Sequence, residues 1–532
     1  MISMPVIELP RILTGIQFGM DEVSSVFLLF TSLIWVITGV YAFFYMKNDR
    51  AKPRFFTSYF LTMAGNIGLI LAQDMVGFYL FFALMTFAAY PLTIHDETPK
   101  ARYAGKVYIV MALIGETLLI SAMMLIASGA ESTSFRDIGA AVVVSGHQDI
   151  FIGLVLSGLG IKTGALLLHM WLPLAYTAAP VAAAGVLSGA MINAGLLGWV
   201  RFLPFGEIAL PGWGTLCLVA GIAAAFYGVV VGLLQDDPKT VLAYSSISQM
   251  GIMTLVIGVG LTVPEAWSAA LSCLLIYATH HAFSKSSLFL GVGVARGMSR
   301  NPFLFAGLLL PSLALAGAPF TSGAVAKTAL KAISEAAHGG WAGWLEWLLP
   351  LTAVGTTTLM VRFFLLAVTS RKAGGTHGPA AGVLLSWAIL LVCAGAAGFA
   401  LPFDDSINAV RLSFSVKNIL SALWPVLGGA FLFWIAWRLN KRAAITSRLK
   451  IPPGDLLVLI AAVFRRLKSG WNHLSVAFEK WKAHFALKSP GLSIGAFVSN
   501  AIIQVESGLA RWFFAGIVFL LLAAILSALM NV

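Results

Sequence analysis

The sequence predicts an all-α polytopic membrane protein with about 14 transmembrane helices. Two observations lead to this fold class. Of the 532 residues, 59% are hydrophobic and only 11% are charged, whereas soluble domains carry about 25% charged residues. The apolar residues also form long runs, and a helix needs about 20 of them to cross the bilayer hydrocarbon. Lipid cannot hydrogen-bond the backbone, and the runs are too long for barrel strands, so we expect helices.

The apolar runs define the individual spans, which are separated by short polar or charged loops. The predicted spans are residues 23–46, 56–73, 75–94, 107–128, 150–169, 179–203, 212–234, 239–262, 267–294, 303–334, 345–369, 379–400, 419–438 and 511–531.

The basic residues predict the orientation of the chain. With the N-terminus outside, the inner loops are 47–55, 95–106, 170–178, 235–238, 295–302, 370–378 and 439–510. Most of the 34 Lys and Arg flank or occupy these loops. An excess of basic residues on the inside is the usual pattern of membrane proteins. We therefore expect both termini outside, in a bacterial inner (plasma) membrane, and attribute the net charge of +12 to contact with lipid headgroups and not with nucleic acid.

The spans group into two sets of five. Because five is odd, the second set runs opposite to the first, which is the arrangement of an inverted repeat. The predicted segments are an N-terminal segment with the first helix (1–55), the first five-helix repeat (56–204), the second five-helix repeat (212–369), two additional helices (379–438), a basic amphipathic segment on the inner face (439–510) and a C-terminal helix (511–532).

The fourth span of each repeat is interrupted by glycine and proline. The two stretches are "GIKTGALLLHMWLPLAYTAAP" at 160–180 and "LAGAPFTSGAVAKTALKA" at 315–332. A broken helix at membrane depth is tolerated where protein or a wet cavity covers the freed backbone groups. The predicted helix breaks are Gly164, Pro173, Pro180, Gly317, Pro319 and Gly323.

Ionisable residues inside the spans form the candidate functional site. Such residues are costly in a membrane and often mark an ion pathway or a proton relay. Lysine and histidine can take up and release protons when neighbours adjust their basicity. Structural alternatives are that Lys239 reaches the headgroups, that His169 braces a helix break, and that Arg362 is a tether. The predicted proton relay consists of Glu116, Lys162, His169, Lys239, His281, Lys285 and Lys327.

Four stretches resemble the antiporter-like membrane subunits of respiratory complex I, Mrp-type cation/proton antiporters and membrane-bound hydrogenases. They are "HMWLPLAYTAAP", "QDDPKTVLAYSSISQMG", "HHAFSKSSLFLGVG" and "GAPFTSGAVAK", and the resemblance covers roughly residues 18–370. It implies an inverted-repeat fold in which a glutamate pairs with Lys162, in which Lys239, His281 and Lys285 connect the halves, and in which Lys327 ends the relay.

The chain departs from the family pattern at two positions. Ala83, in "LFFALMTFAAY", stands where the family usually has its glutamate, and Glu116 on the next span is the carboxylate that could replace it. Asn193, in "AMINAGLLGWVRF", stands where many members have Lys or His. An asparagine cannot carry the proton, so a link between the halves there needs water.

These observations favour a proton-translocating subunit of a larger membrane complex, with other membrane subunits as partners and with Na+ exchange as an option. No cofactor or metal signature is visible, so any redox chemistry of a quinone oxidoreductase or hydrogenase type would belong to partners. One alternative is a subunit of an inorganic-carbon uptake or gradient-driven cation antiport complex without a redox partner. Others are a scaffold with a degenerate relay, and an enzyme acting on lipid-linked substrates through the loop at 94–102.

Overall fold

The computed structural model describes residues 4–9, 15–127, 132–298, 301–369, 378–443, 451–454 and 457. The predicted span 511–531 and nearly all of the predicted amphipathic segment 439–510 lie outside the described residues. The chain divides into one unit of Met1–Ile7 with Gln17–Gly454 and another of Glu8–Ile16 with Asp455–Val532. The first unit contains every helix described below.

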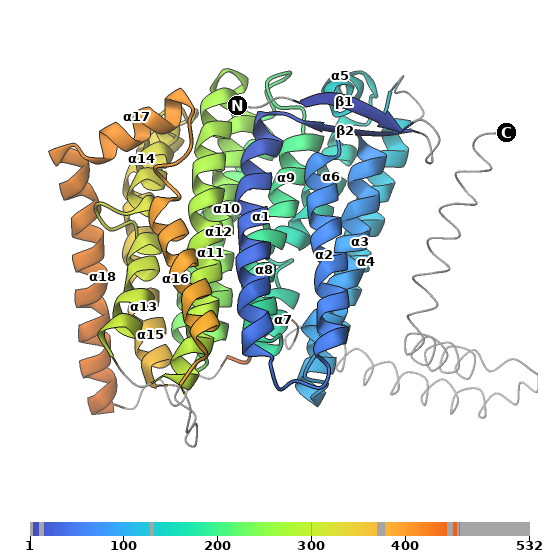
Figure 1. Cartoon of the computed structure of the whole chain (residues 1–532). Coiled ribbons are helices and arrows are strands. Elements are labelled where there is room, and N and C mark those ends of the chain that lie inside the picture. Colours follow the sequence, from blue (N-terminus) through green and yellow to red (C-terminus); the bar gives the residue numbers. More distant parts are fainter. Residues whose placement is uncertain are drawn as a thin grey trace, which may run out of the picture. The chain divides into compact units, whose positions relative to one another are not determined.

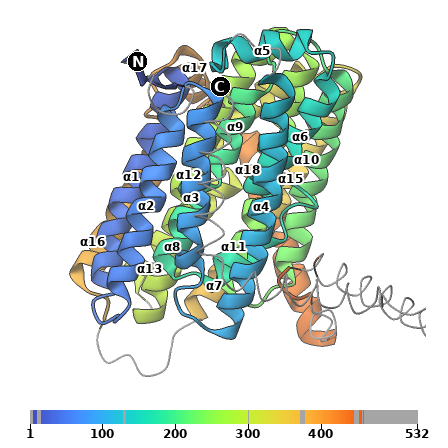
Figure 2. The same ribbon diagram turned by 90° about the vertical axis from the view of Figure 1, so that its right-hand side faces the viewer.

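Helices form almost all of this unit, which confirms the all-α fold class (Figures 1 and 2). The long helices and half-helices are α1 Glu22–Tyr45, α2 Lys52–Leu71, α3 Met75–Thr93, α4 Pro99–Ala127, α6 Gln148–Thr163, α7 Trp171–Ala178, α8 Val181–Val186, α9 Asn193–Phe202, α10 Pro211–Leu233, α11 Pro238–Thr262, α12 Trp267–Gly297, α13 Pro302–Ala316, α14 Ser322–Glu335, α15 Trp341–Thr369, α16 Ala381–Ala396 and α18 Val416–Ala443. The short elements are strands β1 Met4–Leu9 and β2 Ile16–Met20, which pair, and helices α5 Phe135–Val144 and α17 Asp404–Ser413.

The predicted spans up to 419–438 each coincide with a helix or with consecutive helical pieces. Within the described residues, eight helices are long and apolar enough to cross a membrane. Others, such as those that cover α6 and α7 or α13 and α14, are divided by a break. The total of 14 therefore stays a prediction. The structure corrects one loop, because the predicted inner loop 170–178 contains α7, the second half of a broken helix.

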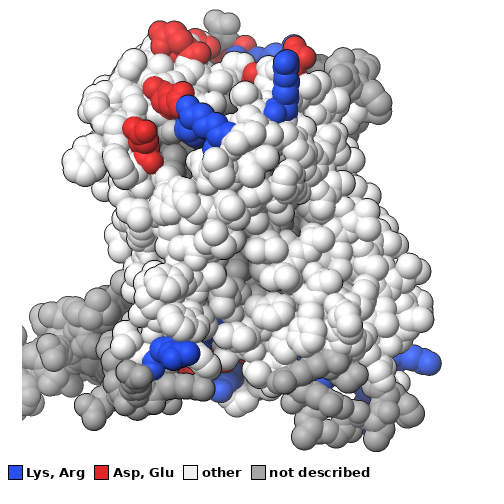
Figure 3. Space-filling model, turned by 90° about the vertical axis from the view of Figure 1, so that its left-hand side faces the viewer, with Lys and Arg blue, Asp and Glu red and all other residues white. Residues whose placement is uncertain are grey.

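The described loops between α1 and α2 and between α3 and α4, both predicted to lie inside, are at one end of the bundle, where α7 is labelled, and α5 and α17 are at the opposite end (Figure 1). Figure 3 shows, on one face of the molecule, a broad band without charged side chains between two charged ends. A band of this kind matches the hydrocarbon layer of a bilayer. Which end faces the inside of the cell stays a prediction.

Glycines bring α10 and α11 into backbone contact. Gly214, Gly221 and Gly228 on α10 are seven residues apart, and a Cβ added to any of them would lie 2.5 to 2.7 Å from a backbone oxygen of α11. Small residues that let backbones approach closely are a common basis of helix packing in membranes. This contact holds α11 against α10, and the residues of α11 are buried from Pro238 to Leu261.

The helix that follows α7 contains a π turn, Leu187–Met191, between α8 and α9. Such a turn accommodates one extra residue and changes the face that the following residues present. A Cβ on Gly189 would lie 2.6 Å from the Ala282 oxygen of α12, whereas one on Gly195 would lie 2.8 Å from the Leu159 oxygen of α6. One helix thus packs closely on both sides.

The two broken helices are interrupted by the same backbone motif. α6 ends at Gly164 with φ 71° and ψ 38°, and α13 ends at Gly317 with φ 75° and ψ 35°. In each case the next amide nitrogen bonds a carbonyl five residues earlier, which is the Schellman cap that favours glycine. Three residues after each glycine, Leu167 and Phe320 also have positive φ values of 72° and 64°. The internal repeat is therefore visible in the backbone.

The other predicted break residues have different positions. Pro173 lies in the first turn of α7, where its missing N–H needs no partner, and Pro180 separates α7 from α8. Pro319 lies in the second loop, between α13 and α14. Gly323 lies inside α14, where a Cβ would come within 1.7 Å of the Ala314 oxygen. Gly323 therefore permits contact between the half-helices and does not interrupt them.

An ion pair and a histidine–aspartate hydrogen bond fasten ends of helices in the N-terminal half. At one end, Arg201 of α9 donates two hydrogen bonds to the Asp21 carboxylate, at 2.5 and 2.9 Å, and Asp21 caps α1. Burial alone would raise the pKa of Asp21, but the hydrogen bonds and charge of Arg201 outweigh it, so this pKa is lowered. At the other end, His95 Nε2 lies 2.9 Å from Asp49 Oδ2, and this hydrogen bond lowers the pKa of Asp49.

Candidate functional site

Glu116 and Lys162 lie on neighbouring helices that touch through glycine. Gly115 of α4 and Gly158 of α6 pack so closely that a Cβ on either would lie 2.9 Å from the other's carbonyl oxygen. Glu116 follows Gly115 directly, and Lys162 lies one turn after Gly158. Both side chains are buried, Glu116 being 2% exposed and Lys162 5% exposed. The glycine contact thus brings a carboxylate and an ammonium group into the same region of the core.

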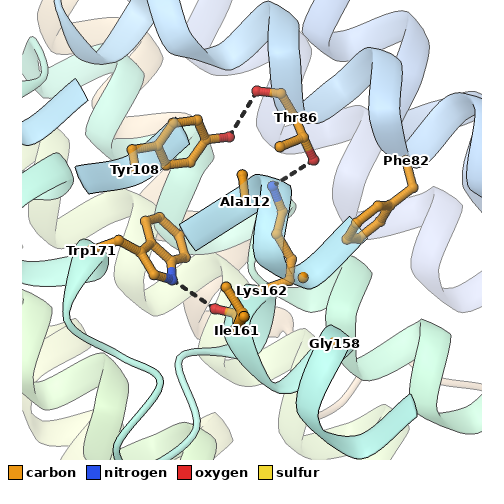
Figure 4. A pocket seen from close by; sticks show the side chains of 9 residues that line it. Phe82, Thr86, Tyr108, Ala112, Gly158, Ile161, Lys162 and Trp171 are labelled. Carbon is orange, nitrogen blue, oxygen red and sulfur yellow. Dashed lines mark hydrogen bonds between the residues drawn. The ribbon is translucent and has the colours of Figure 1, made fainter. Parts of the chain in front are cut away.

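Lys162 points into a small cavity with aromatic walls (Figure 4). Its ammonium group donates a hydrogen bond to Thr86 Oγ1 at 3.4 Å and lies 5.6 Å from the ring centre of Phe82 and 5.8 Å from that of Tyr108. Rings at this distance attract a cation. The cavity offers about 10 Å³ to the centre of a water molecule, which is close to the space that one water needs.

The wall of this cavity is held by bonds to the backbone. The Tyr108 hydroxyl donates to the Thr86 carbonyl at 2.9 Å, and Trp171 Nε1 donates to the Ile161 carbonyl at 2.6 Å (Figure 4). Trp171 is the first residue of α7, beyond the helix break. The side chain of the second half-helix therefore closes the cavity beside the lysine of the first.

Both oxygens of Glu116 are buried without a hydrogen-bond partner among the described protein atoms. An isolated buried carboxylate costs much free energy unless it is paired, solvated or protonated. Ala83, where the family glutamate was expected, is buried on α3, one turn before Thr86. The helix that lacks the carboxylate thus supplies the hydroxyl partner of Lys162, and the next helix supplies the carboxylate.

Lys239 opens α11 and binds the end of α7. Its ammonium group donates a 2.6 Å hydrogen bond to the carbonyl of Ala179, the residue before Pro180. Asp237 caps α11 through the Thr240 amide, and the hydroxyls of Thr240 and Thr177 lie 2.8 Å apart. Lys239 is 5% exposed. Its charge is directed to the first broken helix, so Lys239 does not extend to the surface as the alternative required.

Lys285 and His281 lie on the same face of α12, four residues apart, in the centre of the unit. The Lys285 ammonium donates to Ser245 Oγ at 2.7 Å and to the Leu242 carbonyl at 3.0 Å, both on α11. His281 is fully buried, and neither ring nitrogen has a hydrogen-bond partner among the described protein atoms. Both of these partners of Lys285, a hydroxyl and a backbone carbonyl, are uncharged.

Lys327 follows the second break and reaches back across it. Its ammonium group donates a hydrogen bond to the carbonyl of Ala316, in the last turn of α13. The side chain passes directly over Gly317, where a Cβ would lie 2.3 Å from Lys327 Cδ. The carbonyl end of a helix attracts a positive charge. Lys327 therefore binds the negative end of a half-helix and not a carboxylate.

His169 lies within the first break and is fully buried, with its ring 5.1 Å from that of Tyr227 on α10. Arg362 of α15 bonds the Gln235 carbonyl at 3.0 Å and Asp236 Oδ1 at 2.8 Å. Arg362 thus ties α15 to the loop between α10 and α11, as the tether alternative stated.

The structure brings each predicted relay lysine to a polar group or helix end of another element, and it does not join the predicted relay residues into one continuous chain. In the described part of the molecule, no hydrogen bond joins Glu116, Lys162, Lys239, His281, Lys285 or Lys327 to another member of this set. Sequence reasoning missed Thr86 as a partner of Lys162. Its signal in the sequence was a hydroxyl three residues after Ala83, the position where the resemblance places a glutamate beside the lysine.

His280 is a further site residue that the predicted relay did not include. Its Nδ1 lies 2.9 Å from Ser322 Oγ, at the start of α14. Its signal in the sequence is the pair of consecutive histidines in an apolar span. Among the described residues, no group of three or more His, Cys, Asp or Glu side chains is placed to hold a metal ion.

Comparison with known proteins identifies the family. The family model "NADH:quinone oxidoreductase/Mrp antiporter, TM" matches residues 72–345. Hydrogenase-4 component B of Escherichia coli K12 is 29% identical over 284 residues, which are 52% of this chain and 42% of that protein. NADH-quinone oxidoreductase subunit L of Mycobacterium tuberculosis is 30% identical over 404 residues, or 71% of this chain and 62% of that protein. The chain thus spans about half the length of the curated relatives it matches.

The fold is also found in a solved assembly. The structure of the Mrp complex from Dietzia sp. DQ12-45-1b contains a chain that matches with a TM-score of 0.74 and 21% identity, covering 95% of this chain and 57% of that one. The buried lysines and the two broken helices are the features that the resemblance predicted, and the family model matches the part of the chain that contains them. The chain belongs to the NADH:quinone oxidoreductase/Mrp antiporter family and is an antiporter-like membrane subunit.

Proposed function

We propose that the chain translocates protons across the membrane as one subunit of a larger complex. The observation that carries this proposal is that Lys162, on a broken helix, lines a cavity of about 10 Å³, and that Glu116 is buried next to Gly115, which lines the same cavity. A carboxylate, an ammonium group and room for water are the components of a proton relay. The complete relay would use Glu116, Lys162, His169, Lys239, His281, Lys285 and Lys327.

The partners of the buried lysines suit groups that gain and lose a proton. Lys285 binds Ser245 Oγ at 2.7 Å. A hydroxyl can accept a hydrogen bond from an ammonium group and donate one to a neutral amine. The Thr86 hydroxyl offers Lys162 the same choice at 3.4 Å. Both protonation states of these lysines can therefore be hydrogen-bonded without a change of partner.

The two five-helix repeats, 56–204 and 212–369, would each provide one half of the path. Lys239 supports a connection between them, since it lies on α11 and bonds the end of α7 at 2.6 Å. Across the gaps between relay residues, water would carry the proton. The driving force would come from other membrane subunits, because this path includes no redox group.

Proton flux in vesicles tests the proposal. The complex purified through the full-length chain would be reconstituted with a pH-sensitive dye inside, and flux would be driven by a preset gradient. Lys162→Ala and Lys327→Ala should each abolish the flux carried by the wild type. Lys331→Ala is the matched control, because Lys331 lies one turn after Lys327 on α14 and no relay role is proposed for it.

Undiminished flux in both Lys162→Ala and Lys327→Ala would exclude the relay. Repeating the assay with and without Na+ on one side would identify the exchanged ion. Flux that requires Na+ would assign the chain to cation/proton exchange, and flux indifferent to Na+ would assign it to proton movement alone. The proteins that copurify with the chain would identify the energy source.

A further inference from the structure

His280 faces a different neighbour from the histidine next to it. Consecutive residues on a helix point about 100° apart, so His280 and His281 cannot share a face of α12. His281 shares its face with Lys285, which bonds α11. His280 instead places Nδ1 2.9 Å from Ser322 Oγ, at the start of α14, and is 1% exposed. It is thus the histidine of the pair that contacts the second broken helix.

The hydrogen bonds of Ser322 define which nitrogen of His280 carries the proton. Ser322 Oγ donates its only hydrogen to the Ala394 carbonyl of α16, at 2.9 Å. It therefore accepts from His280, so Nδ1 carries a hydrogen, and the Ser284 hydroxyl, 3.5 Å from the same nitrogen, is a weaker second contact. In a neutral imidazole with Nδ1–H, the other nitrogen, Nε2, has the free lone pair. Ser322 thus fixes the ring and leaves Nε2 as the basic nitrogen.

His280 lies against the face of α14 that carries Lys327. A Cβ on Gly323 would be 3.2 Å from His280 Cε1, the ring carbon between Nδ1 and Nε2. Gly323 and Lys327 are four residues apart on α14 and share one face. Lack of a side chain at Gly323 therefore lets the edge of the imidazole approach the helix one turn before the lysine.

We propose that His280 carries protons between the His281 and Lys285 pair on α12 and Lys327 on α14. This inference rests on the proposed function. A proton from Lys285 or His281 binds Nε2 of His280 and forms an imidazolium ion. The same Nε2 then releases that proton, directly or through water, to the neutral amine of Lys327. Nδ1–H stays bonded to Ser322 throughout, so one proton enters and one leaves at Nε2.

Two substitutions separate a carrier from a structural brace. In His280→Asn the amide N–H can still donate to Ser322 Oγ, but the side chain can no longer bind an extra proton. In Ser322→Ala the brace is lost and the imidazole remains. A carrier role predicts that His280→Asn lowers proton flux on the order of 100-fold, while Ser322→Ala keeps most of it. A purely structural role predicts the reverse order.

The assay is the reconstituted complex described above, with melting temperature in detergent as the measure of folding. If His280→Asn fails to fold, His280→Gln is the second variant. The longer Gln side chain places its amide nearer to the position of the imidazole Nε2, and the amide does not bind an extra proton. Wild-type flux in a folded His280→Asn or His280→Gln protein, together with loss of flux in Lys162→Ala and Lys327→Ala, would overturn this inference alone. Flux retained in both lysine variants would instead overturn the proposed function.

Discussion

The two broken helices share a backbone and differ in chemistry. Gly164 and Gly317 have nearly the same left-handed conformation, and each is followed three residues later by a second positive φ. The lysines, however, stand on opposite sides of the break. Lys162 precedes Gly164 by two residues, whereas Lys327 follows Gly317 by ten. The repeat thus preserves the interruption of the helix and not the position of the charge.

The surroundings of the two lysines differ in the same way. Lys162 has a carboxylate-bearing helix beside it, a hydroxyl at 3.4 Å and two aromatic rings. Lys327 has the carbonyl end of α13. A carboxylate can itself exchange a proton, and a helix end can only stabilise charge. Under the proposed function, the first half would exchange protons between Glu116 and Lys162, whereas Lys327 in the second half would depend on a neighbouring residue.

The largest expected effect is in the second break. Gly323→Ala would place a Cβ 1.7 Å from the Ala314 oxygen, so the half-helices must separate, at a cost of about 3 kcal/mol or more. At the equivalent place in the first break, six residues after the capping glycine, the chain has Met170. We expect Gly323→Ala to lower the melting temperature and the yield of folded protein.

Gly343→Ala is the control, because a Cβ at that glycine of α15 meets no atom within 4 Å. A Gly323→Ala protein as stable as Gly343→Ala would show that the second break has no tighter packing than the first.

The next effect concerns the carboxylate of the first half. Glu116→Ala should lower proton flux about tenfold or more, because Lys162 loses the only carboxylate proposed to serve it. Ala83 is buried on α3 one turn before Thr86, which binds Lys162. The double variant Glu116→Ala with Ala83→Glu, which returns the acid to the position expected from the family, should recover part of the flux. If the single variant keeps full flux, the two halves do not differ in the way described.

A smaller effect is expected at the Asp21–Arg201 pair, which fastens α1 to α9 in the first half. Asp21→Asn should destabilise the protein by about 1 to 2 kcal/mol without a change in flux, since the pair is outside the relay. The pKa of Asp21 is lowered in the folded state, so its contribution is complete above the ordinary carboxyl range and is lost as pH falls through the lowered value.

The melting difference between wild type and Asp21→Asn should therefore be largest at neutral pH and shrink in acid. A difference that is constant with pH would contradict the assignment to the ionised pair.

The smallest effect is expected at Asp49 and His95, which join the loops before α2 and α4. The hydrogen bond from His95 lowers the pKa of Asp49, so this contribution is also present above the ordinary carboxyl range and lost in acid. Because Asp49 is partly exposed, Asp49→Asn should cost only about 0.5 kcal/mol. Arg362→Gln breaks the tether to Asp236, and its loss of stability is the corresponding measurement for a surface contact in the second half.

Much of the fold could be predicted because the bilayer imposes long apolar helices. The breaks were also visible as glycine and proline, but their exact places were not. Pro173 is harmless in the first turn of α7, and the conformation of Gly164 ends α6. Which role a glycine or proline takes depends on its place in the helix, so the sequence alone predicts a loop at 170–178, where the structure has α7.

The lysines of the site could be predicted because a charge in a span is rare. Their partners could not, since Thr86 and Ser322 are ordinary polar residues until the fold brings them to Lys162 and His280. Serine and threonine in membrane helices often bond their own backbone, and the sequence does not reveal which of them turn outward.

The π turn at Leu187–Met191 has a consequence for how the halves stay in register. Gly189, inside it, meets α12, and Gly195, just after it, meets α6. One helix therefore packs against both halves, and the face that makes the contact changes from α12 to α6 within a few residues. Removing one residue there would restore a regular winding and turn Gly195 away from α6, so the chain cannot shorten this segment without separating α9 from α6.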